Sequence, residues 1–158
     1  MASTRATFVV LIVIWFTVSS IAQVVWTLPQ SKGKILFDET LNEHERSRIS
    51  VGYSDLAKEL GNSGYDIETL TLGPITYEKL SEYDVFVVTA PSGTPRYLAT
   101  DEIQAVRRFL EDGRGLLLAS PGRSFASGID VDSESNPVNQ IGREFGVTVN
   151  DDCIYDPT

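Results

Sequence analysis

From residue 34 onward, short apolar segments with strand character alternate with segments that have helical periodicity. The strand-like segments are Lys34–Asp38, Ile67–Leu72, Val85–Ala90, Gly115–Ser120 and Val147–Asn150. The helix-like segments between them begin at Ser54, Thr76, Thr100 and Asn136. This alternation is typical of a parallel sheet with right-handed crossover connections. We therefore predict an α/β fold, a flavodoxin-like three-layer sandwich with a mainly parallel five-stranded sheet.

The residue pattern of each strand predicts its place in the sheet. Val85–Ala90 is a continuous β-branched and apolar run, as expected of a central strand covered on both faces. Gly115–Ser120 is predicted to be another buried strand, whereas Ile67–Leu72 alternates like a half-exposed edge strand. In a flavodoxin-like order, Lys34–Asp38 and Val85–Ala90 flank the point where ligands bind.

The helices carry recognisable start and stop residues. Ser54 is expected to cap a helix over 54–63, and Thr100 to cap the next long helix, which Gly113 ends. Asn136-Pro137 is a strong helix start, because Pro suits the first helical position. The apolar stripe of the helix from Thr100 comprises Ile103, Val106, Phe109 and Leu110. The shared apolar face of the last helix comprises Val138, Ile141 and Phe145. Val87 and Phe109 are predicted to be buried in the core.

Before the alternating region lies an uncharged run of 21 residues, Phe8–Leu28. About 20 apolar residues suffice to span a bilayer. One interpretation is a retained N-terminal anchor, in which Trp26 lies at the membrane interface. The alternative is a signal peptide with Arg5 as its basic region, cleaved near Ala22. Residues 1–28 are thus an anchor or signal, 29–33 a linker and 34–158 the α/β domain.

Charge and composition exclude several classes of function. The net charge is −9, and every acidic residue lies at or beyond Asp38. So acidic a domain is a poor binder of nucleic acid, which requires basic patches. With one cysteine, Cys153, and one histidine, His44, neither an internal disulfide nor a multi-histidine metal site is expected. No Gly-x-Gly-x-x-Gly follows the first strand, and no cofactor is predicted.

Several longer phrases occur in a characteristic order. They are FDETLNEHE (37–45), YSDLAKEL (53–60), YEKLSEYDVFVV (77–88), TDEIQAVRRFLEDGRGLLLASP (100–121) and FGVTVNDDCIYDPT (145–158). Together they resemble the class I glutamine amidotransferase-like superfamily, in particular its non-catalytic branch. That branch includes a membrane-associated domain of unknown function and the GldG and intraflagellar-transport GIFT-like domains. The resemblance implies a flavodoxin-like sandwich behind an N-terminal membrane segment. The superfamily normally continues beyond the fifth strand, so the resemblance implies that the domain 34–158 lacks the superfamily's C-terminal part.

The catalytic chemistry of that superfamily is not expected here. Its catalytic members place a cysteine in a Gly-x-Cys-x-Gly turn after the strand that corresponds to Gly115–Ser120. In this chain the nucleophile position holds Ser120, Leu118 replaces the first glycine, and Pro121 has no N–H to donate to an oxyanion. The superfamily's late histidine has no counterpart, because the one histidine is His44. We therefore predict a protein that is not an enzyme.

Polar residues that follow the predicted strands form a candidate ligand site. These residues are Asp38, Glu39, Asn42, His44, Ser92 and Ser120. Their carboxylates, amides and hydroxyls suit a ligand that offers hydroxyl or amine groups, as sugars and peptides do; the alternative is a solvated loop. The segment 130–134 resembles the start of a calcium loop but lacks its later ligands, so no metal is predicted.

Together these patterns predict a membrane-tethered, non-catalytic module outside the cytoplasm. It would bind a small molecule or a protein partner, as an accessory to a membrane transport or scaffold complex. The alternative is a divergent hydrolase or amidotransferase that uses Ser120 or carboxylates of the acidic loop.

Overall fold

The computed structural model describes residues 31–41, 48–89, 96–120 and 136–150. The predicted membrane segment Phe8–Leu28 lies outside the described residues. None of the helices that are described is long and apolar enough to cross a bilayer. Residues 31–158 cluster into one compact unit, and the following description concerns that unit.

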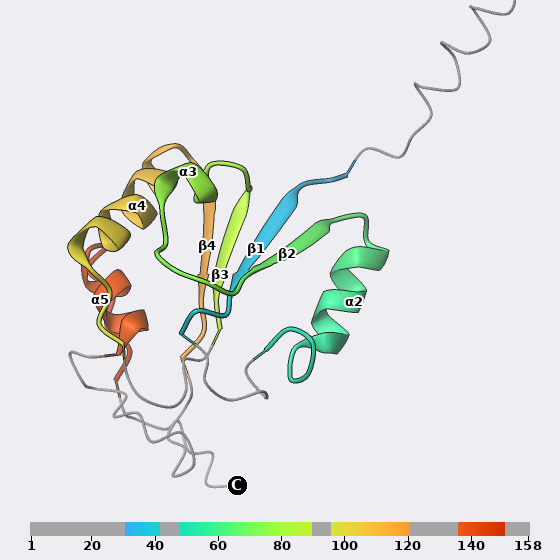
Figure 1. The fold of residues 1–158 in the computed structure, drawn as a ribbon, viewed down its shortest axis with the longest axis horizontal. Coiled ribbons are helices and arrows are strands. Elements are labelled where there is room, and N and C mark those ends of the chain that lie inside the picture. Colours follow the sequence, from blue (N-terminus) through green and yellow to red (C-terminus); the bar gives the residue numbers. More distant parts are fainter. Residues whose placement is uncertain (1–30, 42–47, 90–95, 121–135, 151–158) are drawn as a thin grey trace, which may run out of the picture. The chain divides into compact units, whose positions relative to one another are not determined.

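Four strands form one parallel sheet in the order β2-β1-β3-β4 (Figure 1). Their bounds are Lys34–Asp38 for β1, Asp66–Leu70 for β2, Val85–Val88 for β3 and Gly115–Leu118 for β4. This order places the apolar strands β1 and β3 at the centre of the sheet. It also confirms the predicted edge position of β2. An α/β fold with a parallel sheet is therefore present, with four strands in the described residues.

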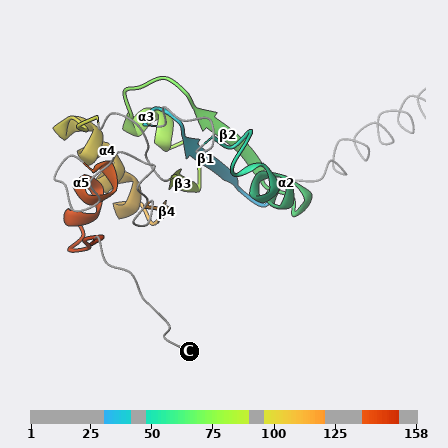
Figure 2. The same cartoon turned by 90° about the horizontal axis from the view of Figure 1, so that it is seen from below.

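The helices lie on both faces of the sheet. They are α2 (Ser54–Asn62), α3 (Tyr77–Leu80), α4 (Thr100–Glu111) and α5 (Pro137–Arg143). Figures 1 and 2 show α2 on one side of the sheet and the other three helices on the opposite side. The chain thus forms three layers, with the sheet in the middle.

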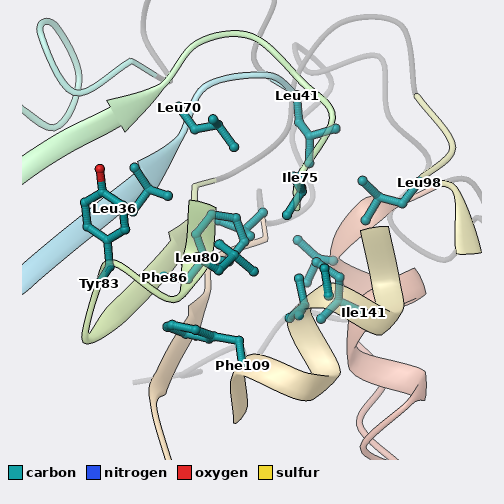
Figure 3. Packing of buried hydrophobic residues seen from close by; sticks show 14 residues of the cluster. Leu36, Leu41, Leu70, Ile75, Leu80, Tyr83, Phe86, Leu98, Phe109 and Ile141 are labelled. Carbon is teal, nitrogen blue, oxygen red and sulfur yellow. The ribbon is translucent and has the colours of Figure 1, made fainter. Parts of the chain in front are cut away.

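Alternation along the strands divides the core between the two faces. Leu36, Phe86 and Val88 belong to the larger cluster on the face of α3, α4 and α5, together with Phe109 of α4 (Figure 3). Ile35, Phe37 and Val87 pack on the face of α2. Val87 and Phe109 are buried, as predicted.

The three expected helix caps have different outcomes. The side-chain oxygen of Asn136 accepts a hydrogen bond from Val138 N at 3.0 Å, and Pro137 occupies the first turn, as predicted. Thr100 and Ser54, by contrast, are the first residues of α4 and α2 and not their caps. The cap positions belong to Ala99 and Tyr53. For Thr100 the prediction was wrong because the side chain of Glu102 accepts a hydrogen bond from the backbone N–H of Ala99 instead.

The prediction of a fifth strand at Val147–Asn150 was wrong, because these residues form no strand. Val147 N donates to Gly142 O at 2.9 Å at the end of α5. The Asn139 side chain then binds Val149 twice, through Val149 N at 2.8 Å and Val149 O at 3.0 Å. Backbone groups that would pair with β4 are thus bonded to α5.

Two apolar residues are also more exposed than predicted. Leu117 of β4 is 51% exposed and Phe145 is 41% exposed. Since β4 is an edge strand among the described residues, and α2 lies toward the other edge, Leu117 has no helix over it. Gly115–Ser120 is therefore not the buried strand that its composition indicates.

Candidate functional site

The carboxyl ends of β1 and β3 mark the point where the chain reverses its direction across the sheet. The chain goes from β1 through α2 to β2 on one side, then crosses back through α3 to β3 on the other. Asp38, the last residue of β1, is in register with Val88, the last residue of β3. In open α/β sheets this arrangement leaves a crevice outside the strand ends, where ligands commonly bind.

Asp38 lies at this point with its side chain almost completely buried, 1% exposed. Its Oδ1 accepts hydrogen bonds from Thr40 N at 2.9 Å and Thr40 Oγ1 at 2.7 Å. Burial raises the pKa of Asp38 above its ordinary value, although the Thr40 hydrogen bonds and the positive charge of Arg96 act in the opposite direction. The two hydrogen bonds from Thr40 hold the Asp38 carboxyl group in a fixed orientation at the end of the strand.

Arg96 and Glu102 form a bidentate ion pair beside Asp38. Arg96 Nη1 donates to Glu102 Oε2 at 2.8 Å, and Arg96 Nη2 donates to Glu102 Oε1 at 3.0 Å. The Glu102 side chain is 2% exposed, whereas that of Arg96 is 40% exposed. Two parallel hydrogen bonds fix the plane of the guanidinium group, so Arg96 presents a rigid, half-exposed cation.

Backbone groups complete the surroundings of Glu102. Ile75 N donates to Oε1 at 2.9 Å and Ala99 N donates to Oε2 at 3.0 Å. Burial acts to raise the pKa of Glu102, but the hydrogen bonds from Arg96, Ile75 and Ala99 outweigh it, and the pKa lies below its ordinary value. The charged carboxylate therefore joins the segment after β2 to the segment before α4.

The residues Asp38, Arg96 and Glu102 comprise two acidic side chains and one basic side chain. Arg96 is the common electrostatic partner of Asp38 and Glu102, so two carboxylates share one guanidinium. The pairing with Glu102 is the direct one, and Asp38 interacts with Arg96 through space. Such a site favours a ligand that brings hydrogen-bond donors or positive charge, because carboxylate oxygens act as acceptors.

The other predicted ligand residues have separate environments. Glu39 Oε1 accepts a hydrogen bond from Ile49 N at 2.9 Å, so it holds the chain before α2. Ser120 is half-buried just beyond β4, and β3 lies between β4 and β1. Asn42, His44 and Ser92 lie outside the described residues.

The sequence prediction missed Arg96 and Glu102. From the sequence, Glu102 is recognisable only as an acid in the first turn of a helix, a position that the helix dipole favours. A signal was available, since an arginine shortly before a helix and an acid in its first turn are close enough to pair. What the sequence does not contain is the backbone of Ile75, which comes from another part of the fold.

Metal binding has no support among the residues that the structure describes, since no three of their His, Cys, Asp and Glu side chains form a group that could hold an ion. Comparison with known proteins gives no further assignment: no protein-family model and no curated protein matches this chain.

Proposed function

We propose that the chain is a membrane-tethered, non-catalytic α/β module that binds a polar ligand or partner outside the cytoplasm. The observation that carries this proposal is the buried Asp38 carboxylate at the carboxyl end of β1, beside the Arg96–Glu102 pair. Burial of a carboxylate costs free energy unless a partner compensates it. A recognition group for a ligand is a reason to keep such a residue there.

The chemistry of the site favours a ligand with hydroxyl or amine groups, such as a sugar or a peptide. Asp38 supplies a fixed acceptor, and Arg96 supplies donors at the half-exposed side of its ion pair. The strand order β2-β1-β3-β4 equals that of the first four strands of the flavodoxin-like fold. It supports assignment to that fold, as does the resemblance to the non-catalytic amidotransferase-like branch. The tether would be Phe8–Leu28.

Ligand binding is tested by NMR titration of the full-length protein in detergent with two probes, glucose and a dialanine peptide. We expect shifts of the backbone signals of Asp38, Thr40 and Arg96 with at least one probe. Asp38→Asn should abolish these shifts, because an amide replaces one acceptor oxygen by a donor. Asp55→Asn, at an exposed residue of α2, is the matched control and should retain them. Shifts that persist in Asp38→Asn, or that are absent with both probes, contradict the proposed site.

The non-catalytic part of the proposal predicts that Ser120 is not a nucleophile. A serine hydroxyl without an adjacent base is weakly reactive, and loss of an oxyanion-hole donor costs about 2.7–4 kcal/mol of transition-state stabilisation. We expect no glutaminase or esterase activity and no fluorophosphonate labelling of the full-length protein. The same assays on Ser120→Ala provide the comparison. Labelling or turnover that disappears in that variant would support the alternative hydrolase function.

A further inference from the structure

The outer edge of β2 carries backbone groups that are not used by the sheet. Asp66 N donates to Gly33 O at 3.0 Å, and Leu70 O accepts from Glu39 N at 2.8 Å, so these residues bond toward β1. Successive residues of a strand direct their backbone groups to alternate sides. Ile67 and Thr69 therefore direct their N–H and C=O groups away from β1. Among the described strands, none pairs with this side.

A groove of about 690 Å³ follows the same edge, between β2 and α2. Figure 1 shows α2 and β2 together at one end of the domain. The groove is lined on the strand side by Ile67, Glu68 and Thr69, and on the helix side by Ser54, Ala57 and Lys58. Its wall thus combines strand backbone groups that pair with no described strand, the small side chains Ser54 and Ala57, and the exposed Lys58. A strand edge beside small side chains suits an extended peptide.

The helix beside the groove leaves apolar surface uncovered. Helix α2 is amphipathic, yet none of its residues is buried. Leu56 is 43% exposed, and Val51, just before the helix, is 50% exposed. An amphipathic helix normally buries its apolar stripe. Within the groove itself, Ala57 and Ile67 are only half-buried, so apolar side chains of a partner would cover them.

The opposite face of β2 is acidic. Asp66 is exposed, and the Glu68 side chain is 54% exposed although it accepts a hydrogen bond from Tyr83 Oη and lies 3.9 Å from Lys79 Nζ. In a second copy paired antiparallel and centred on Glu68, the two Glu68 carboxylates would be directly opposite each other. Like charges in that position are destabilising, so a different partner with basic side chains fits better.

We propose that the free edge of β2 binds an extended segment of a partner protein as an added strand. The segment alternates small apolar side chains, which enter the groove beside Ala57 and Ile67, with basic side chains, which face Asp66 and Glu68. Backbone hydrogen bonds to Ile67 and Thr69 hold it. This interaction surface is separate from the site at Asp38 and does not depend on its ligand.

The test is fluorescence polarisation of the full-length protein in detergent with a fluorescein-labelled hexapeptide that alternates lysine and valine. Thr69→Pro removes the outward N–H without removing a hydrogen bond to β1, and proline is tolerated at such positions of edge strands. We expect it to weaken binding about tenfold or more, since one hydrogen bond is lost and the ring hinders close approach. Thr69→Val keeps the N–H and should bind like the wild type. A hexapeptide of alternating glutamate and valine should bind about tenfold more weakly than the lysine peptide.

Amide exchange of the wild type gives a second measurement that does not depend on any variant's folding. The bound lysine peptide should slow exchange at Ile67 and Thr69. Equal affinity of Thr69→Pro and wild type, equal affinity for the two peptides, or unchanged exchange at both amides would overturn the proposal. A dimer that protects Thr69 without peptide would overturn it in favour of a second copy.

Discussion

At the scale of single residues, Glu102 shows how burial and pairing compete. Its carboxylate is almost completely removed from water, and each of its two oxygens accepts two hydrogen bonds. Charged hydrogen bonds are stronger than neutral ones, while a buried group that loses its partner incurs the full desolvation cost. The pair with Arg96 therefore sets the local geometry at the carboxyl end of the sheet.

Glu102→Gln is expected to lower the free energy of unfolding by about 1–3 kcal/mol at neutral pH. The amide group places N–H donors against the N–H groups of Arg96 and Ala99. Glu111→Gln, on the same helix, is the matched control. Its ion pair with Arg107 is 62% exposed on the glutamate side, so it should change stability by about 0.5 kcal/mol or less. Urea denaturation of both variants measures the difference.

The effect of Glu102 should depend on pH in a defined direction. Its folded-state pKa lies below the ordinary value of 4.5, so the stabilisation is complete above that pH and is lost as the pH falls through the folded-state pKa. The difference between wild type and Glu102→Gln should therefore shrink in acid. A difference that stays constant from neutral pH to below the folded-state pKa would contradict the ionised pair.

At the scale of elements, α4 connects the core to the site. Val106 and Phe109 of this helix are fully buried against the sheet, while Glu102 in its first turn binds Arg96. At the C-terminal end of α4, Tyr77 Oη of α3 donates to Asp112 Oδ2 at 2.6 Å. The Arg108 guanidinium lies 3.7 Å from the centroid of the Tyr77 ring. Helix α4 thus makes side-chain contacts at both ends and on its buried face.

Phe109→Ala is expected to cost about 3–5 kcal/mol, the usual range for truncation of a buried phenylalanine. Phe145→Ala offers the matched control, because that ring is 41% exposed and its removal creates no enclosed cavity. The urea midpoints of the two variants provide the measurement. Similar midpoints would indicate that α4 does not pack against the sheet through Phe109.

Gly142→Ala tests the path of the chain after α5. An added Cβ would lie 2.7 Å from Val147 O, a backbone atom that cannot move aside cheaply. We expect a loss of about 1–3 kcal/mol from this overpacking. In Gly61→Ala on α2, the added Cβ meets nothing within 4 Å, so alanine should be neutral or stabilising by up to about 1 kcal/mol. Equal thermal unfolding of the two variants would contradict the close approach.

At the scale of the whole molecule, the proposed membrane attachment concerns residues outside the described part. The uncharged run Phe8–Leu28 precedes a domain in which all acidic residues occur at or beyond Asp38. We propose that the apolar run enters a bilayer while the charged domain stays in water, because about 20 apolar residues suffice to span. The free edge of β2 and the site at Asp38 then belong to the domain that remains in solution.

Carbonate extraction of membranes is the measurement for this attachment. We expect the full-length chain to stay in the pellet, whereas a variant that begins at Lys32 should be soluble. A soluble product shortened to begin near Gln23 would support the cleaved signal peptide instead. An uncleaved full-length chain in the soluble fraction would contradict both interpretations.

Much of the fold was predictable because its elements are defined by local patterns. The apolar run Val85–Val88 and the amphipathic helix Thr100–Glu111 lie within one residue or two of their predicted bounds. Of the candidate site, Asp38 was predictable from its place at a strand end. The Arg96–Glu102 pair is local in sequence and could have been predicted, whereas the hydrogen bond from Ile75 could not, because that residue is far away in sequence.

The amino-acid pattern is sufficient to predict the alternation of elements, the buried faces of β3 and α4, and the start of α5 at Asn136-Pro137. These features depend on side-chain periodicity and capping, which act over a few residues. Contacts that form only in the folded domain bind Val147–Asn150 to α5, leave Leu117 exposed at an edge and bury the charge of Glu102. The deciding feature is a particular hydrogen-bonding partner, whether close in sequence like Gly142 for Val147 or distant like Ile75 for Glu102, or the lack of a covering helix among the described residues. Local periodicity carries no information about either.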